Sequence, residues 1–353
     1  METKSTRAYG TQSPAADLQE IEILRRSPQE NDIAIDIMYC GVCHSDLHTA
    51  RNDWGGTIYP AVPGHEIVGR ITQVGSAVTK FKVGDLAAVG CLVDSCKHCS
   101  SCEQDLEQYC LEGSTGTYNS ADKFIPSQRT YGGYAESVVV DQHFVLKVPE
   151  NLDAAAVAPL LCAGITTYSP LKHWNAGPGK KVAVIGLGGL GHMAIKLAKG
   201  LGATVSLFSR SASKIQDAKE LGADHVIIST DEAQMEAVAG EFDLIIDTVP
   251  YVHDVNPYVQ TLAISGTLVL VGYLGGLEPI LNTVPMIMGR RSVAASLIGG
   301  IAETQEMLDF CGAHNIVSDI ELIRMQDINT AYERMLKSDV KYRFVIDMAS
   351  LKD

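Results

Sequence analysis

The 353-residue chain has no long uninterrupted apolar segment. Its longest apolar run lies around Ala154 to Ile165, is interrupted by Pro159, and is shorter than the roughly 20 residues that a bilayer-spanning helix requires. The first residues, Met1 to Gly10, also lack the apolar centre of a secretory signal. These absences predict a protein without a membrane partner, and the cytoplasm is its expected location.

Positive charge is scarce as well. The 28 Lys and Arg residues are outnumbered by 42 Asp and Glu residues, which gives a formal net charge of -14 at pH 7. Nucleic acids are bound through basic patches, so we expect no nucleic-acid partner. The nine cysteines are too few for a disulfide scaffold in a chain of this length. In the cytoplasm they indicate metal binding or buried thiols instead.

The length favours two domains, because single hydrophobic cores stop growing at this size. Short β-like runs broken by Gly and Pro fill the chain from Ala34 to about Val148, whereas strand and helix patterns alternate after Pro149. This change predicts an α/β protein with a mainly β domain and a doubly wound parallel sheet. We expect the β domain over residues 1–150, completed by residues 291–353, and the parallel sheet over residues 151–290.

A glycine-rich motif marks a dinucleotide site. Gly186-Leu187-Gly188-Gly189-Leu190-Gly191 satisfies G-x-G-x-x-G directly after the strand pattern 181–185 and directly before a helical stretch. In that context the first glycine permits a tight turn and the second lets backbone approach the pyrophosphate. The third lets the helix pack on the strand. The start of the helix offers unpaired N–H groups to the phosphates.

The end of the second strand of this domain indicates which dinucleotide is bound. NAD-specific sites place an acidic residue there, about 20 residues beyond the motif. This chain has Ser209-Arg210-Ser211 instead, and Asp217 is the first carboxylate downstream. Arg210 and Lys214 can pair with a 2′-phosphate, and the hydroxyls of Ser209 and Ser211 can hydrogen-bond it. Arg210 as a plain surface charge is the alternative, but the missing acid favours NADP(H).

Four of the cysteines are close together in the sequence, with C-x2-C-x2-C-x7-C spacing: Cys96, Cys99, Cys102 and Cys110. Four soft ligands at such spacing suit a closed tetrahedral zinc site with a structural role. A redox-active C-x-x-C pair is the competing interpretation, but no thioredoxin-like βαβ pattern surrounds it.

Three more residues, Cys43, His65 and Cys162, offer the ligand set of a catalytic zinc, which keeps one coordination position open. Their spacing alone does not bring them together, and each by itself is more often a buried thiol or a satisfied histidine. Local context favours the metal interpretation, namely Cys43-His44-Ser45-Asp46-Leu47-His48, Gly64-His65-Glu66, and the segment from Cys162 to Thr167.

With these motifs the chain resembles the zinc-containing medium-chain alcohol dehydrogenases, in particular the cinnamyl-alcohol-dehydrogenase-like group and its bacterial NADP-dependent aldehyde reductases. The resemblance covers essentially the whole chain. It implies a GroES-like catalytic domain, a Rossmann domain, two zinc ions per chain, NADP(H) and a homodimer. The implied reaction is hydride transfer between NADPH and aromatic or aliphatic aldehydes, with zinc as the Lewis acid.

The resemblance also assigns roles by position. Cys43, His65 and Cys162 match the catalytic zinc ligands, Glu66 matches a carboxylate that can approach the metal, and Asp46 matches the acid that orients His65. Ser45 and His48 match the two ends of a proton relay through the nicotinamide ribose, with Ser45 next to substrate and cofactor. The positions implied to contact the cofactor are Thr166, Thr248, Gly272, Ser296, Leu297, Ile298 and, at the pyrophosphate, Arg343. The residues implied to line an apolar substrate pocket are Leu47, Trp54, Leu92 and Leu297.

Two other functions remain open. Some relatives reduce conjugated C=C or C=N bonds, and these typically lose the relay or keep only a structural zinc. Others bind the cofactor without turnover. The complete sets of relay residues and zinc ligands argue against both alternatives, and a metal content of about two zinc ions per chain would separate them from the enzyme.

Overall fold

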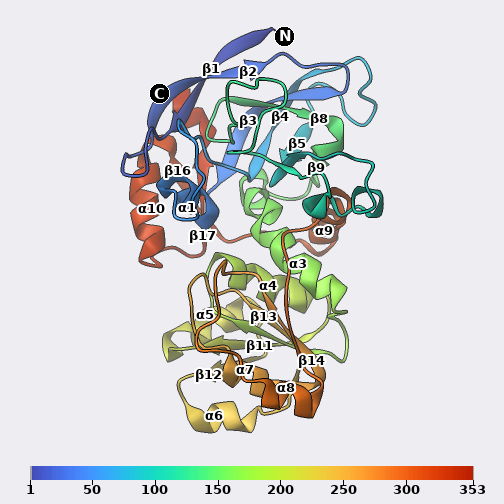
Figure 1. The fold of residues 1–353 in the computed structure, drawn as a ribbon, viewed down its shortest axis with the longest axis vertical. Helices are drawn as coiled ribbons and strands as arrows, with labels where there is room; N and C mark the ends of the chain where they lie inside the picture. The colour runs from blue at the N-terminus through green and yellow to red at the C-terminus, as the bar shows by residue number, and fades with distance from the viewer. Residues whose placement is uncertain (1, 353) are drawn as a thin grey trace. The chain divides into compact units, whose positions relative to one another are not determined.

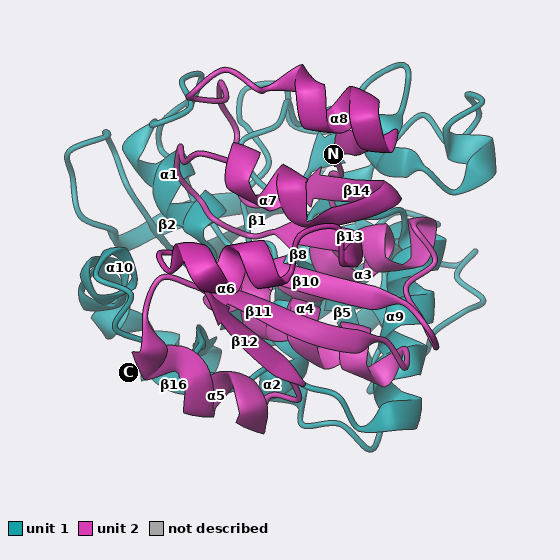
Figure 2. Ribbon diagram, turned by 90° about the horizontal axis from the view of Figure 1, so that it is seen from below, with its two compact units in different colours: residues 1–162, 299–353 teal, residues 163–298 magenta. Residues whose placement is uncertain are grey.

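The computed structural model describes residues 2–352, which fall into two compact units. Unit 1 comprises residues 1–162 and 299–353, and unit 2 comprises residues 163–298 (Figures 1 and 2). The C-terminal segment therefore completes the unit that the N-terminal part begins. The chain passes between the units at 162/163 and at 298/299. The sequence pattern had placed both changes earlier, at 150/151 and 290/291.

Unit 1 is built on a mostly antiparallel sheet of seven strands. Its six-strand path is β16 (Ile320–Arg324), β17 (Arg343–Asp347), β3 (Asp32–Gly41), β4 (Ile67–Val74), β5 (Leu86–Val89) and β9 (Leu146–Lys147), and β8 (Ser137–Asp141) also pairs with β3. Only β16 and β17 run parallel. Two further strand pairs are β1 (Thr3–Gly10) with β2 (Gln19–Arg26) and β6 (Leu92–Asp94) with β7 (Thr115–Gly116). The strands from β3 to β9 fall in the region where the sequence shows short β-like runs, whereas the pair β1–β2 precedes that region and was missed.

Helices of 4 to 14 residues complete unit 1. They are α1 (His44–Arg51), α2 (Ala154–Val157), α9 (Ile301–His314) and α10 (Ile328–Leu336). In α10 the residues Ile328, Ala331, Tyr332 and Met335 are buried. They recur every three or four positions, which is the spacing of one helix face turned towards a core. Helices α9 and α10 both belong to the C-terminal segment that completes this unit.

Unit 2 is built on a six-stranded, all-parallel sheet, in agreement with the predicted doubly wound parallel sheet. The order is β12 (His225–Ile228), β11 (Thr204–Ser209), β10 (Lys181–Ile185), β13 (Phe242–Asp247), β14 (Leu262–Leu270) and β15 (Ser292–Ala295). Its helices are α3 (Ala163–His173), α4 (Gly189–Gly200), α5 (Ile215–Glu220), α6 (Glu232–Ala237), α7 (Asn256–Thr261) and α8 (Thr283–Gly289). The order reverses between β10 and β13, and this is where doubly wound sheets bind their ligands.

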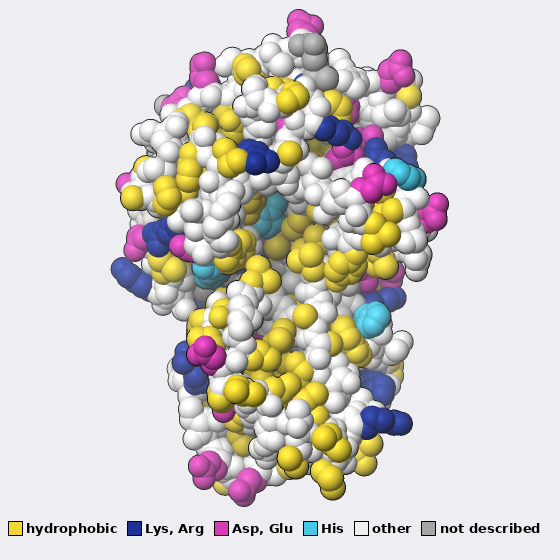
Figure 3. Space-filling view, in the orientation of Figure 1, with side chains coloured by type: hydrophobic (Ala, Val, Ile, Leu, Met, Phe, Trp, Pro, Cys, Tyr) yellow, Lys and Arg dark blue, Asp and Glu magenta, His cyan; other side chains and the backbone are white. Residues whose placement is uncertain are grey.

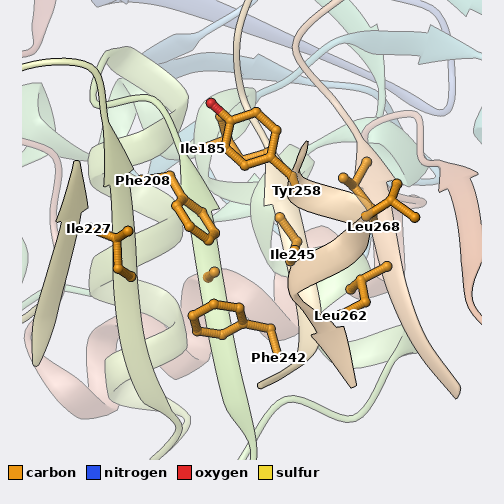
Figure 4. Packing of buried hydrophobic residues seen from close by; sticks show 10 residues of the cluster. Ile185, Phe208, Ile227, Phe242, Ile245, Tyr258, Leu262 and Leu268 are labelled. Carbon is orange, nitrogen blue, oxygen red and sulfur yellow. The ribbon is translucent and has the colours of Figure 1, made fainter. Parts of the chain in front are cut away.

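A hydrophobic cluster fixes the strands of unit 2 against α7. Figure 4 shows Phe208 of β11 and Ile245 of β13 beside Tyr258 of α7. The ring of Phe208 meets those of Phe242 and Tyr258 edge-on, with centroids 5.4 and 5.1 Å apart. Such pairs stabilise by about 0.5–1.5 kcal/mol beyond their burial. The carboxyl ends of β11 and β13 are therefore anchored to one core.

No single helix within residues 2–352 combines the length and apolar composition of a membrane span. One bent pair of short helical segments, Ala154–Leu161 with Ala163–His173, reaches those values only when the two are counted together.

Candidate active site

The segment that carries Cys43 is shaped by the start of α1. Cys43 is the N-cap residue, and its backbone N–H donates to the Asp46 carboxylate at 2.8 Å, as in a capping box. Asp46 is fully buried and also accepts from the Gly64 N–H at 3.0 Å and from the Tyr134 hydroxyl at 3.2 Å. One carboxylate therefore ties the segment of Cys43 to the segment of His65.

The structure brings four potential metal ligands together in unit 1. One ligand atom each from Cys43, His65, Glu66 and Cys162 lies within 4.8 Å of all the others. The sulfurs of Cys43 and Cys162 are 3.9 Å apart. Two thiolates bound at about 2.3 Å to one tetrahedral zinc lie about 3.8 Å apart, so this separation fits the metal. The hydrogen bond from Cys162 lowers the pKa of the Cys43 thiol, and the neighbouring His65 lowers it further. A lowered pKa favours the thiolate that zinc requires.

The orientation of His65 also fits a metal ligand. Its Nε2 atom is buried and has no hydrogen-bond partner among the described residues. Its Nδ1 atom lies 3.0 Å from the Tyr118 hydroxyl and 3.3 Å from Asp46 Oδ1. A buried ring nitrogen without a partner is costly unless something binds it, and ligating histidines typically use the other nitrogen for such an orienting contact.

Glu66 occupies the remaining side of this cluster and is paired with Arg343. Its Oε1 atom accepts from Arg343 at 2.5 Å, whereas its Oε2 atom is buried without a partner. Burial raises the pKa of Glu66 to about 7 against the opposing effect of Arg343. Arg343 also donates to the Val42 carbonyl at 2.9 Å. Its predicted place at the pyrophosphate stays a prediction.

Ser45 and His48 lie one turn apart on α1, so they share a helix face. The Ser45 hydroxyl is 3.6 Å from the Cys43 sulfur, next to the metal ligands. The His48 side chain is one quarter exposed, its Nδ1 atom is 2.8 Å from Asp53 Oδ2, and its ring centroid is 5.0 Å from that of Trp54. The pair therefore runs from the buried cluster towards solvent.

The second predicted cluster is also assembled. The sulfurs of Cys96, Cys99, Cys102 and Cys110 lie within 4.8 Å of one another, and those of Cys96 and Cys102 are 3.9 Å apart. Backbone N–H groups of Cys102 and Leu111 lower the pKa of Cys99 to about 6. Every cysteine of residues 2–352 is a free thiol, so no disulfide competes for these sulfurs. Four thiols at tetrahedral spacing fit a closed zinc site.

The glycine-rich loop of unit 2 has the predicted geometry. Gly186 has φ +88°, and a side chain at Gly191 would place its Cβ 2.1 Å from the Gly186 carbonyl oxygen. A Cβ at Gly188, the N-cap of α4, would meet nothing within 4 Å. The first and third glycines therefore serve the turn and the packing, while the second leaves space for a ligand. The Thr248 hydroxyl supports the turn by donating to the Ile185 carbonyl at 2.7 Å.

The predicted 2′-phosphate residues follow β11. Ser209 and Ser211 hydrogen-bond within their own turn, and Ser211 caps the next helical turn by accepting from the Ser213 N–H at 3.2 Å. Arg210 is exposed and donates to the Tyr251 hydroxyl at 2.9 Å. Lys214 has no ion pair within the described chain. The carboxyl end of β11 is thus followed by two positively charged side chains and by several hydrogen-bond donors.

The other predicted residues are spread over both units. Leu47 and Leu92 are buried in unit 1, whereas Trp54 is half exposed. In unit 2, Thr166 is buried in α3, and the remaining predicted positions follow the ends of β14 and β15: Gly272, Ser296, Leu297 and Ile298. Their contacts with substrate or cofactor stay predictions.

The sequence analysis missed three side chains that contact the predicted site residues. Tyr118 touches His65, Asp53 touches His48, and Tyr251 touches Arg210. Asp53 is close enough in sequence to His48 to have been considered. Tyr118 and Tyr251 are 53 and 41 residues from their partners, and no motif marks them.

Comparison with known proteins agrees with this geometry. The family described as alcohol dehydrogenase GroES-like domain matches residues 29–150, and the family described as zinc-binding dehydrogenase matches residues 189–313. Aldehyde reductase YahK of Escherichia coli is 53% identical over 100% of both chains. NADP-dependent alcohol dehydrogenase C 1 of Mycolicibacterium smegmatis is 51% identical over 98% of both. A cinnamyl alcohol dehydrogenase structure from Sorghum bicolor superposes with a TM-score of 0.94 at 44% identity, covering 98% of each chain.

These matches span both units and the whole length of the relatives. They confirm the resemblance that the motifs predicted. The chain belongs to the zinc-binding medium-chain alcohol dehydrogenases, within the group that includes the cinnamyl alcohol dehydrogenases.

Proposed function

We propose that this protein is a zinc-dependent, NADP(H)-linked alcohol dehydrogenase that acts mainly as a reductase of aromatic and aliphatic aldehydes. The observation that carries the proposal is the buried cluster of Cys43, His65 and Cys162, in which one histidine nitrogen has no partner in the described chain. The relatives named aldehyde reductase and NADP-dependent alcohol dehydrogenase support the same reaction class.

In this proposal Cys43, His65 and Cys162 hold the catalytic zinc, with Glu66 beside it, and the four clustered cysteines hold a structural zinc. When bound in the first site, zinc supplies Lewis acidity towards a carbonyl oxygen. Asp46 and Tyr118 hold the His65 ring in the orientation that points Nε2 at the metal position. Arg343 balances the charge of Glu66 so that this carboxylate can stay buried next to two thiols.

The chain itself then provides the route for a proton. Ser45, whose hydroxyl lies beside the ligand cluster, would supply a proton towards the product oxygen, and His48, one turn further along α1, would return protons from solvent. Asp53 fixes the tautomer of His48 by accepting from Nδ1, which leaves Nε2 to exchange the proton with solvent.

The cofactor is assigned to unit 2. The glycine-rich loop 186–191 and the start of α4 receive the pyrophosphate. Arg210 and Lys214, with the hydroxyls of Ser209 and Ser211, receive the 2′-phosphate. NADP(H) is favoured over NAD(H) because the second strand ends without a carboxylate. A reducing compartment such as the cytoplasm suits a protein whose nine cysteines are all free thiols.

Assembly as a homodimer forms part of the proposal. Strand β15 is the last strand of its sheet, and an unpaired sheet edge is a template for another strand. Apolar side chains near that edge are exposed, including Ile280 (89%), Ile287 (76%) and Met288 (81%). Figure 3 shows apolar side chains gathered on the face of unit 2 that carries α8. A second copy of the chain, related by a two-fold axis, would cover this surface.

The proposal is tested by assaying zinc-loaded protein for the loss of NADPH with a panel of aromatic and aliphatic aldehydes. We expect turnover of several aldehydes, a higher kcat/KM with NADPH than with NADH, and no turnover by Cys162→Ala. A fully metal-loaded protein that leaves every aldehyde and alcohol untouched would exclude the proposal. Reduction of conjugated C=C bonds with intact carbonyls would favour the alternative reductase function.

A further inference from the structure

The residue that we assign to the 2′-phosphate is already held in place by another part of unit 2. Arg210 follows β11, whereas Tyr251 follows β13, and β10 lies between these two strands in the sheet. The guanidinium of Arg210 donates to the Tyr251 hydroxyl at 2.9 Å, with its carbon 5.8 Å from the centre of the Tyr251 ring. The contact between Arg210 and Tyr251 therefore passes over the end of β10, the strand that the glycine-rich loop follows.

This contact leaves most of the Arg210 side chain available to a ligand. A guanidinium has five N–H donors, and the Tyr251 hydroxyl accepts from one nitrogen only. No other acceptor within residues 2–352 contacts Arg210. Because Tyr251 accepts this bond, its own O–H is also free to donate. A long arginine side chain loses rotamer entropy when it is fixed, and a partner already present in the free protein reduces the part lost on binding.

The backbone of Tyr251 is fixed in turn by His253. The Nδ1 atom of His253 lies 3.0 Å from the Tyr251 carbonyl oxygen, and its Nε2 atom lies 3.1 Å from Asp247 Oδ2. Asp247 ends β13 and is 1% exposed, so its carboxylate has a fixed position. Its other oxygen accepts from the Val249 N–H at 3.1 Å. The imidazole thus lies between Asp247, at the end of the strand, and Tyr251, which holds Arg210. Its contact with Asp247 is a charge pair of the protonated ring, because Nε2 and Oδ2 do not meet hydrogen-bond geometry.

Both ends of this arrangement rest on the same core. Phe208, two residues before Arg210, and Tyr258, in the helix that follows the loop, pack edge-on in the cluster of Figure 4. The Tyr258 ring is also 6.3 Å from the His253 ring. Loop 249–255 is therefore anchored by Asp247 before it and by Tyr258 after it, which suits a rigid support more than a mobile lid.

We propose that Tyr251 is a positioning residue for cofactor specificity: loop 249–255, with His253 packed against Asp247, holds Arg210 ready to receive the 2′-phosphate of NADP(H). This inference rests on the proposed cofactor preference. It adds that the preference depends on a residue distant in sequence from the segment 209–214 to which we assign the phosphate.

The test compares equilibrium dissociation constants of NADPH and NADH, measured by calorimetry on the zinc-loaded protein without substrate. Tyr251→Phe keeps the ring and removes the acceptor oxygen. We expect NADPH binding to weaken about two- to tenfold, the usual range for one hydrogen bond. NADH binding should change less than about twofold, because NADH lacks the 2′-phosphate. Tyr9→Phe, in β1 of unit 1, is the matched control and should change neither constant.

A double-mutant cycle shows whether Tyr251 acts through Arg210. In the Arg210→Ala background, Tyr251→Phe should weaken NADPH binding no further. His253→Gln should shift the NADPH constant in the same direction as Tyr251→Phe while sparing NADH. Equal losses for NADPH and NADH, or additive losses in the double variant, would overturn the inference.

The outcomes also separate this inference from the function on which it rests. If the unaltered protein binds NADH as tightly as NADPH, the proposed cofactor preference is wrong and the role of Tyr251 falls with it. If the preference exists and Arg210→Ala removes it while Tyr251→Phe leaves it intact, the proposed function stands and only the positioning role is wrong.

Discussion

The phenol of Tyr118 meets the imidazole of His65 at 3.0 Å, from hydroxyl oxygen to Nδ1, with ring centroids 5.4 Å apart. Asp46 Oδ1 approaches the same nitrogen at 3.3 Å. Two groups therefore compete for one ring N–H, and both point the opposite nitrogen into the cluster of thiols. Whichever of them accepts the proton, the orientation of the ring is set from outside the ligand set.

Removing the Tyr118 hydroxyl should weaken the catalytic metal site. For Tyr118→Phe we expect zinc affinity at this site to fall about tenfold, because orienting partners of ligating histidines typically contribute 10- to 100-fold. Zinc release to a chelator measures this without relying on activity. Asp46→Asn should cost more, since Asp46 also accepts from the Cys43 N–H and the Gly64 N–H. Unchanged zinc release in Tyr118→Phe would show that Asp46 alone orients the ring.

The two metal sites should respond differently to loss of one ligand. Cys162→Ala should abolish turnover and reduce zinc to about one ion per chain with little change in Tm, since only the catalytic site is opened. Cys99→Ala should lower Tm by several degrees and increase proteolysis around residues 95–113, because structural zinc contributes folding energy. Metal analysis and thermal scans on both variants check this. A larger loss of Tm in Cys162→Ala would reverse the assignment of the sites.

The Ser45 hydroxyl should matter for turnover far more than for cofactor binding. In Ser45→Ala we expect kcat for aldehydes to fall about a hundredfold or more, as general acid–base steps usually contribute 10²–10⁴. The NADPH dissociation constant should stay within about twofold. Ser45→Thr retains a hydroxyl and should recover part of the rate. Normal turnover by Ser45→Ala would remove this residue from the relay.

The His253–Asp247 pair should make the stability of unit 2 depend on pH. The Asp247 carboxylate raises the pKa of His253 above its ordinary 6.5, although burial of the ring acts in the opposite direction. Asp254 in the same loop raises it further, and Tyr258 packs beside the ring. A raised folded-state pKa gives stability that is fully present below pH 6.5 and is lost as pH rises through the higher value.

Thermal scans of the unaltered protein and His253→Gln from pH 6 to pH 9 test this linkage. The unaltered protein should have the higher Tm at pH 6, by on the order of 2 °C, and the difference should shrink towards pH 9. His225→Gln, at the exposed start of β12, is the control and should show no such trend. A difference that grows with pH would contradict the sign.

Charge placed on the apolar surface of unit 2 should disrupt the proposed dimer. Ile287 and Met288 are more than three-quarters exposed, so Ile287→Glu or Met288→Lys removes no core contact within the chain. We expect the molar mass in solution to fall from two chains to one, because a buried unpaired charge opposes association. Light scattering coupled to gel filtration measures it. Leu111→Glu, on an exposed site of unit 1, should leave the assembly unchanged.

Sequence reasoning succeeded where a feature is local along the chain. The glycine-rich loop, the four-cysteine loop and the absence of an acid after β11 each lie within a short segment, and local spacing decides their geometry. The parallel sheet followed from alternating strand and helix patterns in the same way. The pair β1–β2 was missed, because its strands mix charged and apolar residues and expose much of both faces.

What the amino-acid sequence determined by itself was the set of chemical groups: which thiols, imidazoles and hydroxyls exist, and which of them are neighbours by spacing. Only the tertiary structure decided that Cys43, His65 and Cys162 converge, that Arg343 lies against Glu66, and that Tyr118 and Tyr251 touch His65 and Arg210. The reason is physical. Contacts between residues tens or hundreds of positions apart are fixed by strand pairing and core packing, and no local pattern encodes them.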